Sequence, residues 1–205
     1  MVPIDRYQKA GRMGGLARVH KHGPPGTPEG CRRGGLHSLR THRLKKTGFK
    51  LLRKVIIPKY SIVLAELLGI LAGDGHVDHY QVTMTTNAET DFEHAQYVKK
   101  LFERLFGVFP ALRKRVGMNA CVVEVSSKNV CLFLLRAGLV LGNKVRQQLK
   151  PPAWLVGKAK YSNAFARGLF DTDGCVYTDK HIIRGTLYKN LGMAFTNRSL
   201  PLLAH

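Results

Sequence analysis

The sequence is short of acidic residues. Its 205 residues include 13 Asp and Glu against 33 Lys and Arg, which gives a formal net charge of +20. A chain with this imbalance repels itself and binds polyanions, of which nucleic acid is the commonest. The imbalance is greatest in residues 1–60, where fifteen Lys and Arg accompany only Asp5 and Glu29. An anionic membrane surface is the rival partner for such a charge.

Closely spaced cysteines and long hydrophobic runs are also lacking. The four cysteines stand singly, at Cys31, Cys121, Cys131 and Cys175. Structural zinc sites use tighter ligand spacing, so we interpret them as reduced thiols in a cytosolic setting. The most apolar stretches, 60–73 and 130–142, are too short to span a bilayer. With no signal-peptide pattern, we expect a cytoplasmic (nucleoid-associated) or organellar protein, neither secreted nor membrane-bound.

Residues 1–54 are interpreted as a basic, glycine-rich N-terminal arm. A Gly-Gly-Leu segment at 14–16 recurs at 34–36, and the stretch between them, rich in Gly and Pro, is typical of a loop. Because the arm has little apolar content, we expect it to be largely flexible, without regular structure, until DNA neutralises its charge. Arg32 and Arg33 are its candidate DNA contacts.

Beyond the arm, the hydrophobic pattern predicts alternating helices and strands. The expected elements are a helix at 62–72 with Ser61 as N-cap, a strand at 81–85, an amphipathic helix at 90–106, strands at 111–116 and 121–125, and a helix at 129–137. After the Pro151-Pro152 break, the pattern restarts with a helix at 162–170, strands at 175–177 and 193–195, and a helix start at Ser199. This order predicts a mixed α+β fold rather than a parallel βαβ fold.

Two of the predicted helices end in the same pattern. One ends as Gly69-Ile-Leu-Ala-Gly73-Asp74-Gly75, the other as Gly168-Leu-Phe-Asp171-Thr-Asp173-Gly174. Each pattern places an Asp at the negative end of the helix dipole, where an anion loses about 0.3–1 kcal/mol. The following glycines suit left-handed caps. Two misplaced acids in matching contexts indicate a divalent cation between them.

Small residues recur at four-residue spacing on both helices. Gly69 and Gly73 share one face of the first helix, and Ala164, Gly168 and Thr172 share one face of the second. Small residues at this spacing let two helix backbones approach closely. Packed side by side in the same direction, the helices would bring Asp74 and Asp173 together.

These segments resemble the paired helices of LAGLIDADG homing endonucleases, in which the last acid of each motif binds metal. The similarity covers roughly residues 56–200 and extends through Ile57-Pro58, Asn87-Ala-Glu89-Thr-Asp91, Leu105-Phe106-Gly107 and Gly142-Asn143-Lys144. The resemblance implies αββαββα repeats with an antiparallel, saddle-shaped sheet. A first repeat at 55–152 and a partial second repeat at 153–205 are expected. The first motif departs from the family pattern at Ala72, where an acid is common.

The resemblance also implies the site residues. Mg²⁺ (or Mn²⁺) would be held by Asp74 and Asp173 with main-chain oxygens of Gly73 and Thr172, and would activate water at each scissile phosphate. Lys144 is expected to stabilise charge in the transition state. The residues expected to contact double-stranded DNA are Gln81, Thr83, Thr85, Arg113, Lys114 and Arg115. Arg can pair with guanine and Gln with adenine.

The sequence therefore predicts a site-specific, Mg²⁺-dependent double-strand DNA endonuclease, monomeric at full length. Two alternatives stay open: an RNA maturase, with intron RNA as partner, and a non-catalytic DNA-binding protein with a degenerate endonuclease fold. An intein is disfavoured, since the chain starts at Met1 and lacks a terminal His-Asn. Because far fewer residues follow Asp173 than lie between Asp74 and Pro151, we expect a truncated second repeat. The chain is then expected to be poorly soluble or frayed beyond about residue 175, and to cut DNA weakly or not at all.

Overall fold

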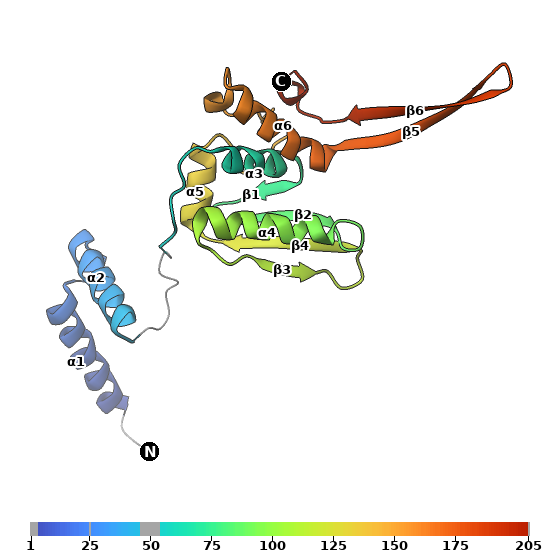
Figure 1. Ribbon diagram of the computed structural model, residues 1–205. Coiled ribbons are helices and arrows are strands. Elements are labelled where there is room, and N and C mark those ends of the chain that lie inside the picture. Colours follow the sequence, from blue (N-terminus) through green and yellow to red (C-terminus); the bar gives the residue numbers. More distant parts are fainter. Residues whose placement is uncertain (1–3, 25, 46–53, 205) are drawn as a thin grey trace. The chain divides into compact units, whose positions relative to one another are not determined.

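The computed structural model describes residues 4–24, 26–45 and 54–204. It divides into two compact units, Met1–Leu51 and Leu52–His205. Each unit is described by itself below. The ribbon in Figure 1 follows both of them along the sequence.

The first unit consists of two helices, α1 (Ile4–His22) and α2 (Pro28–Lys45), joined by a tight turn. Gly23 and Gly26 adopt positive φ angles of 80° and 84° in this turn. The hydroxyl oxygen of Thr27 accepts the N–H of Gly30 at 3.1 Å and so satisfies the first turn of α2.

The expectation of an arm without regular structure is therefore wrong for its described part. Low apolar content limits burial, and indeed none of the described side chains of α2 is buried. It does not prevent local helix formation, because Arg, Lys, Leu and Met are good helix formers. Residues 46–53 of the arm lie outside the described residues.

The second unit begins with a complete αββαββα order. Its elements are α3 (Ile62–Gly73), β1 (Gly75–Val77), β2 (Gln81–Asn87), α4 (Phe92–Phe106), β3 (Ala111–Lys114), β4 (Ala120–Ser126) and α5 (Lys128–Arg136). A short 3-10 turn (Ala153–Leu155) then leads to α6 (Ala159–Asp173), β5 (Gly174–Ile183), β6 (Thr186–Phe195) and α7 (Leu200–Leu203). The fold is α+β with antiparallel sheets, as the sequence predicted.

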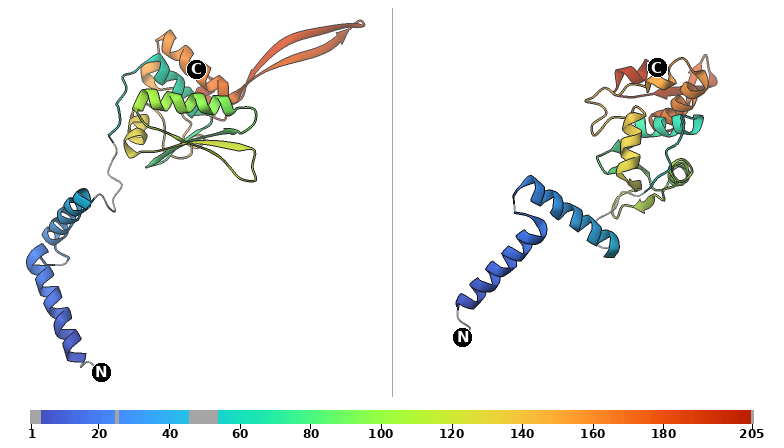
Figure 2. Two further views of the ribbon diagram at one scale, coloured as in Figure 1. Left: turned by 60° about the horizontal axis from the view of Figure 1, so that its bottom comes forward. Right: turned by 90° about the vertical axis from the view of Figure 1, so that its left-hand side faces the viewer.

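The first four strands form one antiparallel sheet in the order β1-β2-β4-β3. Its register pairs Val82 with Val125 and Met84 with Val123, so one face of the sheet is apolar and buried. Helices α4 and α5 cover that face, and Phe102 and Phe106 of α4 are fully buried in the core. Figure 2 shows α4 lying along the sheet. The opposite face of the sheet is left for polar side chains.

Helix α3 lies at the centre of this unit. The hydroxyl of Ser61 accepts the N–H of Leu64 at 3.2 Å, which confirms the predicted N-cap, and every residue from Leu64 to Ala72 is buried. A helix that is apolar on all sides must be covered on all sides, here with α6 and α4 among its neighbours. Within the described ranges, no helix combines the length and the apolar character needed to cross a membrane.

The hairpin of β5 and β6 is much longer than the strands predicted at 175–177 and 193–195. It turns through Arg184 and Gly185, which have φ angles of 50° and 82°, a pair of positive values that suits a two-residue hairpin loop. The sequence analysis missed this turn because Arg-Gly is not one of the usual dipeptides for it. Figure 1 shows the hairpin extending from the end of α6.

Candidate active site and DNA-facing sheet

Helices α3 and α6 pack against each other at their glycines. A Cβ added to Gly69 would collide with the carbonyl oxygen of Phe165, and one added to Gly168 would collide with that of Glu66. One added to Gly73 would collide with the side chain of Thr172. The close approach predicted from the small-residue spacing is confirmed. Gly69 and Gly168 are required because the backbone of the partner helix lies where their side chains would be, and at Gly73 the side chain of Thr172 takes that place.

The close packing brings the two helix-end carboxylates to one place. Asp74 is the C-cap of α3 and Asp173 is the last residue of α6. A Cβ built on Gly73 would lie 3.1 Å from Oδ1 of Asp173, so the carboxylate of α6 reaches the end of α3. Burial, and then the charge of Asp173, raises the pKa of Asp74, and burial raises the pKa of Asp173. Both carboxylates are thus held where their charge is unfavourable.

The glycines that follow these acids do not adopt the predicted left-handed conformation. Gly174 has φ −94°, and Gly75 is not among the residues with positive φ. Glycine is needed at these positions instead because there is no room for a side chain. A Cβ on Gly75 would lie 2.6 Å from the carbonyl oxygen of Leu71, and one on Gly174 would lie 2.5 Å from that of Phe170. Each strand therefore starts directly from the helix end.

Lys144 lies at the same helix ends, far from them in sequence. Its ammonium donates to the carbonyl oxygen of Leu71 at 3.2 Å and to that of Gly73. Burial lowers the pKa of Lys144, while Asp173 and Asp74 oppose that shift. The structure thus gathers Lys144, Asp74 and Asp173. The Gly73 carbonyl, which the sequence analysis assigned to a metal ion, accepts from the lysine here.

Beside the two helix ends is a cavity of about 280 Å³. Its lining includes Gly73, Lys144, Asp173 and Asn197, whereas Asp74 does not line it. The amide of Asn197 donates to Oδ2 of Asp173, and this bond lowers the pKa of Asp173 against the effect of burial. Asn197 was not among the site residues predicted from the sequence. Asn197 lies beside Asp173 because Gly174 pairs with Phe195 across the hairpin. Knowledge of that strand register would have been needed to predict this position.

The remaining proposed metal ligand is Thr172. Its hydroxyl donates to the carbonyl oxygen of Leu169 at 2.9 Å, within its own helix. The side chain is therefore turned back along α6. The main-chain carbonyl oxygen of Thr172 is therefore the atom of this residue that would bind an ion.

A second buried polar group lies on the flank of the paired helices and was missed in the sequence. Glu66, in the middle of α3, is 5% exposed. One of its carboxylate oxygens accepts from the Tyr97 hydroxyl of α4 at 2.7 Å, and the other pairs with Arg167 of α6 at 2.6 Å. A buried carboxylate needs such partners. This cluster therefore ties three helices together.

The polar face of the sheet carries four of the eight predicted DNA contacts. Gln81, Thr83 and Thr85 alternate with the buried residues of β2. Across the sheet, Thr85 pairs with Val122, and Val122 pairs with Arg113, so Arg113 is on the same face. The opposite face is the one that α4 and α5 cover.

The other two predicted basic contacts of β3 are placed differently. Lys114 points to the helix-covered side, where its ammonium lies 5.0 Å from the centre of the Phe92 ring. The strand ends at Lys114 rather than at Val116, and Arg115 lies in the turn, with its N–H bonded to the carbonyl of Ala120 at 2.9 Å. The structure therefore separates Lys114 from the polar face.

Arg32 and Arg33 belong to the first unit. Both are exposed on α2. Arg33 forms an ion pair of 2.6 Å with Glu29, one turn earlier on the same helix. Of the two, Arg32 is the one without an ion pair among the described residues, so its guanidinium can bind a partner outside the chain.

No protein-family model matches the sequence. Two curated relatives are DNA polymerases, from Thermococcus kodakarensis (28% identical over 138 residues) and Methanocaldococcus jannaschii (27% over 141 residues). The matches cover 58% and 60% of this chain. The chain spans only 7% and 8% of the length of these polymerases, so it is similar to a small part of each.

Solved structures similar to this chain include two nucleases bound to DNA. The meganuclease I-SmaMI with an uncleaveable DNA superposes with a TM-score of 0.48 at 12% identity, over 70% of this chain and 71% of that one. The complex of I-DmoI with DNA and Mn gives a TM-score of 0.38 at 17% identity, over 64% and 89%. Similarities at this level leave the function to be inferred from the residues of this chain.

Proposed function

We propose that the chain is a divalent-metal-dependent DNA endonuclease of the homing type, which hydrolyses phosphodiester bonds of a double-stranded target at the ends of α3 and α6. The observation that carries this proposal is the meeting of Asp74, Asp173 and Lys144. The two acids lie beside each other, each at the unfavourable end of a helix dipole, with Asp173 half-buried and Asp74 exposed, and partial desolvation raises the pKa of each. Groups kept in such costly surroundings are typical of functional sites.

Mg²⁺ or Mn²⁺ suits this donor set. Two neighbouring, partly desolvated carboxylates that repel each other are stabilised by a cation between them. Hard cations prefer carboxylate and carbonyl oxygens, and Mg²⁺ is usually held by one or two carboxylates with waters and substrate phosphates. No group of three or more His, Cys, Asp or Glu suited to a metal occurs in the described part of the chain. The proposed ligands are Asp74 and Asp173 with main-chain oxygens of Gly73 and Thr172, as the resemblance to the LAGLIDADG family implies.

When bound, the ion supplies a water of lowered pKa and charge neutralisation at the leaving oxygen. The protein groups have separate tasks. Asp74 and Asp173 hold the ion, and the amide of Asn197 fixes the orientation of Asp173. Lys144, already desolvated, places a positive charge where negative charge develops on the phosphate. If the Gly73 carbonyl ligates the ion, the ammonium must first release it.

The polar sheet face is the proposed surface for the major groove. Gln81 can read adenine and Arg113 guanine, while Thr83 and Thr85 can contact either kind of base pair. The net charge of +20 supplies the sequence-independent attraction to phosphates. An RNA maturase could use the same basic surface, but RNA binding alone gives no reason to hold two acids beside each other.

The proposal is tested with a duplex library, Mg²⁺ and four versions of the chain. The unaltered protein should cut, whereas Asp74→Asn or Asp173→Asn should lower cutting at least about 10²-fold and leave duplex binding largely intact. Glu103→Gln is the matched control, because it removes a carboxylate from the outer face of α4 and should cut normally. Full cutting by either Asp variant would sink the assignment. Duplex binding without any cutting by the unaltered chain would favour the non-catalytic alternative.

A further inference from the structure

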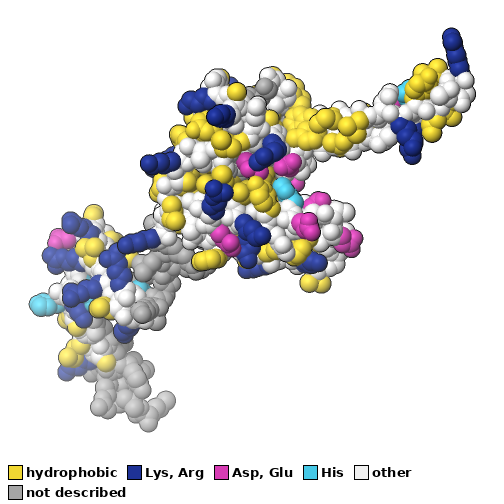
Figure 3. All heavy atoms as spheres, viewed as in Figure 1, with side chains coloured by type: hydrophobic (Ala, Val, Ile, Leu, Met, Phe, Trp, Pro, Cys, Tyr) yellow, Lys and Arg dark blue, Asp and Glu magenta, His cyan; other side chains and the backbone are white. Residues whose placement is uncertain are grey.

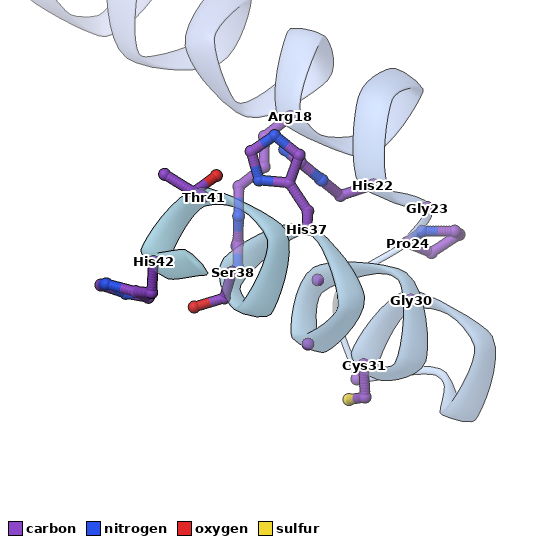
Figure 4. A pocket seen from close by; sticks show the side chains of 13 residues that line it. Arg18, His22, Gly23, Pro24, Gly30, Cys31, His37, Ser38, Thr41 and His42 are labelled. Carbon is purple, nitrogen blue, oxygen red and sulfur yellow. The ribbon is translucent and has the colours of Figure 1, made fainter. Parts of the chain in front are cut away.

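Between the two helices of the first unit lies a cleft that the proposed nuclease site does not use. It has a volume of about 620 Å³, and both helices and the turn between them line it. Its residues include Arg18 and His22 of α1 and Gly34, Gly35 and His37 of α2. Figure 4 shows His37 in the space between the helices, with Cys31 on the far side of α2.

The cleft gathers cationic groups without a counter-charge. The rings of His22 and His37 meet edge to face with centroids 4.8 Å apart, and Arg18 lies beside them. Partial desolvation, followed by the charges of His37, Lys21 and Arg18, lowers the pKa of His22. None of the described lining residues is acidic. Glu29, the only acid between residues 9 and 45, is paired with Arg33.

Two glycines of the cleft lining, Gly34 and Gly35, have no packing role among the described residues. A Cβ added to Gly34 or Gly35 would meet no atom within 4 Å. Glycine is the poorest helix former after proline, so its presence in the middle of α2 weakens the helix. A bare backbone at a cleft lets a ligand approach more closely than any side chain would. The cleft, with Gly34 and Gly35 as its floor and Arg18, His22 and His37 as its walls, therefore suits one anionic group.

We propose that this cleft binds a backbone phosphate of double-stranded DNA, with Arg18, His22 and His37 as hydrogen-bond donors and Gly34 and Gly35 as its floor. Guanidinium and imidazole N–H groups are strong donors to phosphate oxygens. A polyanion is favoured over a small anion because Arg32, Arg40 and Arg43 continue the positive charge along α2. Figure 3 shows Lys and Arg side chains crowding the described part of this unit. The proposal rests on DNA being the partner of the proposed nuclease.

The two Gly-Gly-Leu segments provide a matched pair of variants for the test. Gly34→Ala with Gly35→Ala fills the floor of the cleft, whereas Gly14→Ala with Gly15→Ala makes the same change on α1, outside the cleft lining. Both pairs replace glycine where a Cβ meets open space, so both should raise helix content. Binding of the full chain to a duplex of arbitrary sequence is measured by fluorescence anisotropy in EDTA, without metal and without cleavage.

The cleft variant should bind about tenfold more weakly, while the α1 variant should bind as the unaltered chain does. Arg18→Gln should reduce the slope of log K against log salt by about 0.9, the value for one phosphate contact. Equal affinity of the two diglycine variants would overturn the cleft proposal alone. Inorganic phosphate at millimolar concentration competing as well as duplex would also overturn it, in favour of a small-anion pocket. Failure of the unaltered chain to bind duplex would overturn the proposed function as well.

Discussion

At the scale of single residues, removing the side chain of Lys144 should separate the proposed metal binding from the proposed catalysis. Its ammonium bonds to the carbonyl oxygens of Leu71 and Gly73, beside both carboxylates. In Lys144→Met, the Gly73 oxygen is free for an ion and the repulsion between ammonium and ion is gone. Mn²⁺ binding without DNA, measured by calorimetry, should therefore be about equal or several-fold tighter than in the unaltered chain.

Cleavage by the same variant should fall about 10²–10³-fold, because developing negative charge on the phosphate loses a preorganised cation. Lys100→Met, on the exposed side of α4, is the control and should change neither property. A Lys144→Met protein that binds Mn²⁺ several-fold more weakly would contradict this role and would mark the lysine as a support for the site's structure.

The site residues divide into those visible in the sequence and those hidden from it. Asp74 and Asp173 were recognisable because an acid before a glycine, at the end of an apolar helix, occurs twice. Asn197 was not, because its place beside Asp173 depends on the length and register of a hairpin whose Arg-Gly turn gives no strong signal. Glu66 was hidden for a different reason. The partners of this single acid, Tyr97 and Arg167, are remote in sequence, and only the packing of the helices brings them to it.

At the scale of elements, the Glu66 cluster is predicted to hold α3, α4 and α6 in register. Arg167→Met leaves the buried carboxylate of Glu66 with the Tyr97 hydroxyl as its remaining partner. Removing one partner of a buried charge costs up to 3–5 kcal/mol. Because the Arg167 side chain is 60% exposed, we expect about 1–3 kcal/mol in urea unfolding.

The double variant Glu66→Gln with Arg167→Met should recover part of this loss, since it leaves no unpaired buried charge. Arg136→Met, at the end of α5, removes a cation from another helix end and should cost less than about 0.5 kcal/mol. A loss from Arg167→Met no larger than this control would show that the ion pair contributes nothing to the contact between the helices.

Element order was more predictable than element ends. Periodicity predicted the helices and every strand of the first repeat except β1, and the full αββαββα order followed from the family resemblance. The glycine spacing predicted the contact of α3 with α6, because a close approach of two backbones excludes side chains. The ends depended on contacts that are remote in sequence. The strand expected to reach Val116 stops at Lys114, where the turn to β4 begins. The structure of the arm departed from the prediction for a local reason. Its residues have enough helix propensity to form helices without a hydrophobic core.

At the scale of the whole molecule, the two αββ segments of the second unit have unequal surroundings. Strand β2 lies between β1 and β4 and beneath helices, and its inward side chains are buried. Strands β5 and β6 pair only with each other among the described residues. One face of that hairpin carries exposed apolar side chains, namely Val176, Ile182, Leu187, Leu191 and Met193. Figure 3 shows this apolar surface along the hairpin.

Such a hairpin should be far less stable than the four-stranded sheet, because an isolated two-stranded hairpin is marginal in water. Its base is anchored, since Gly174 pairs with Phe195 and the Thr196 N–H bonds to the carbonyl of Asp173. Its outer part has no such support. In hydrogen exchange, amides at 178–191 should therefore exchange at least about 10²-fold faster than those of β2 and β4 in the same sample. Equal protection of the hairpin and the sheet at every protein concentration would contradict this prediction. Protection of the hairpin that is lost on dilution would instead show that a second copy of the chain covers the apolar face.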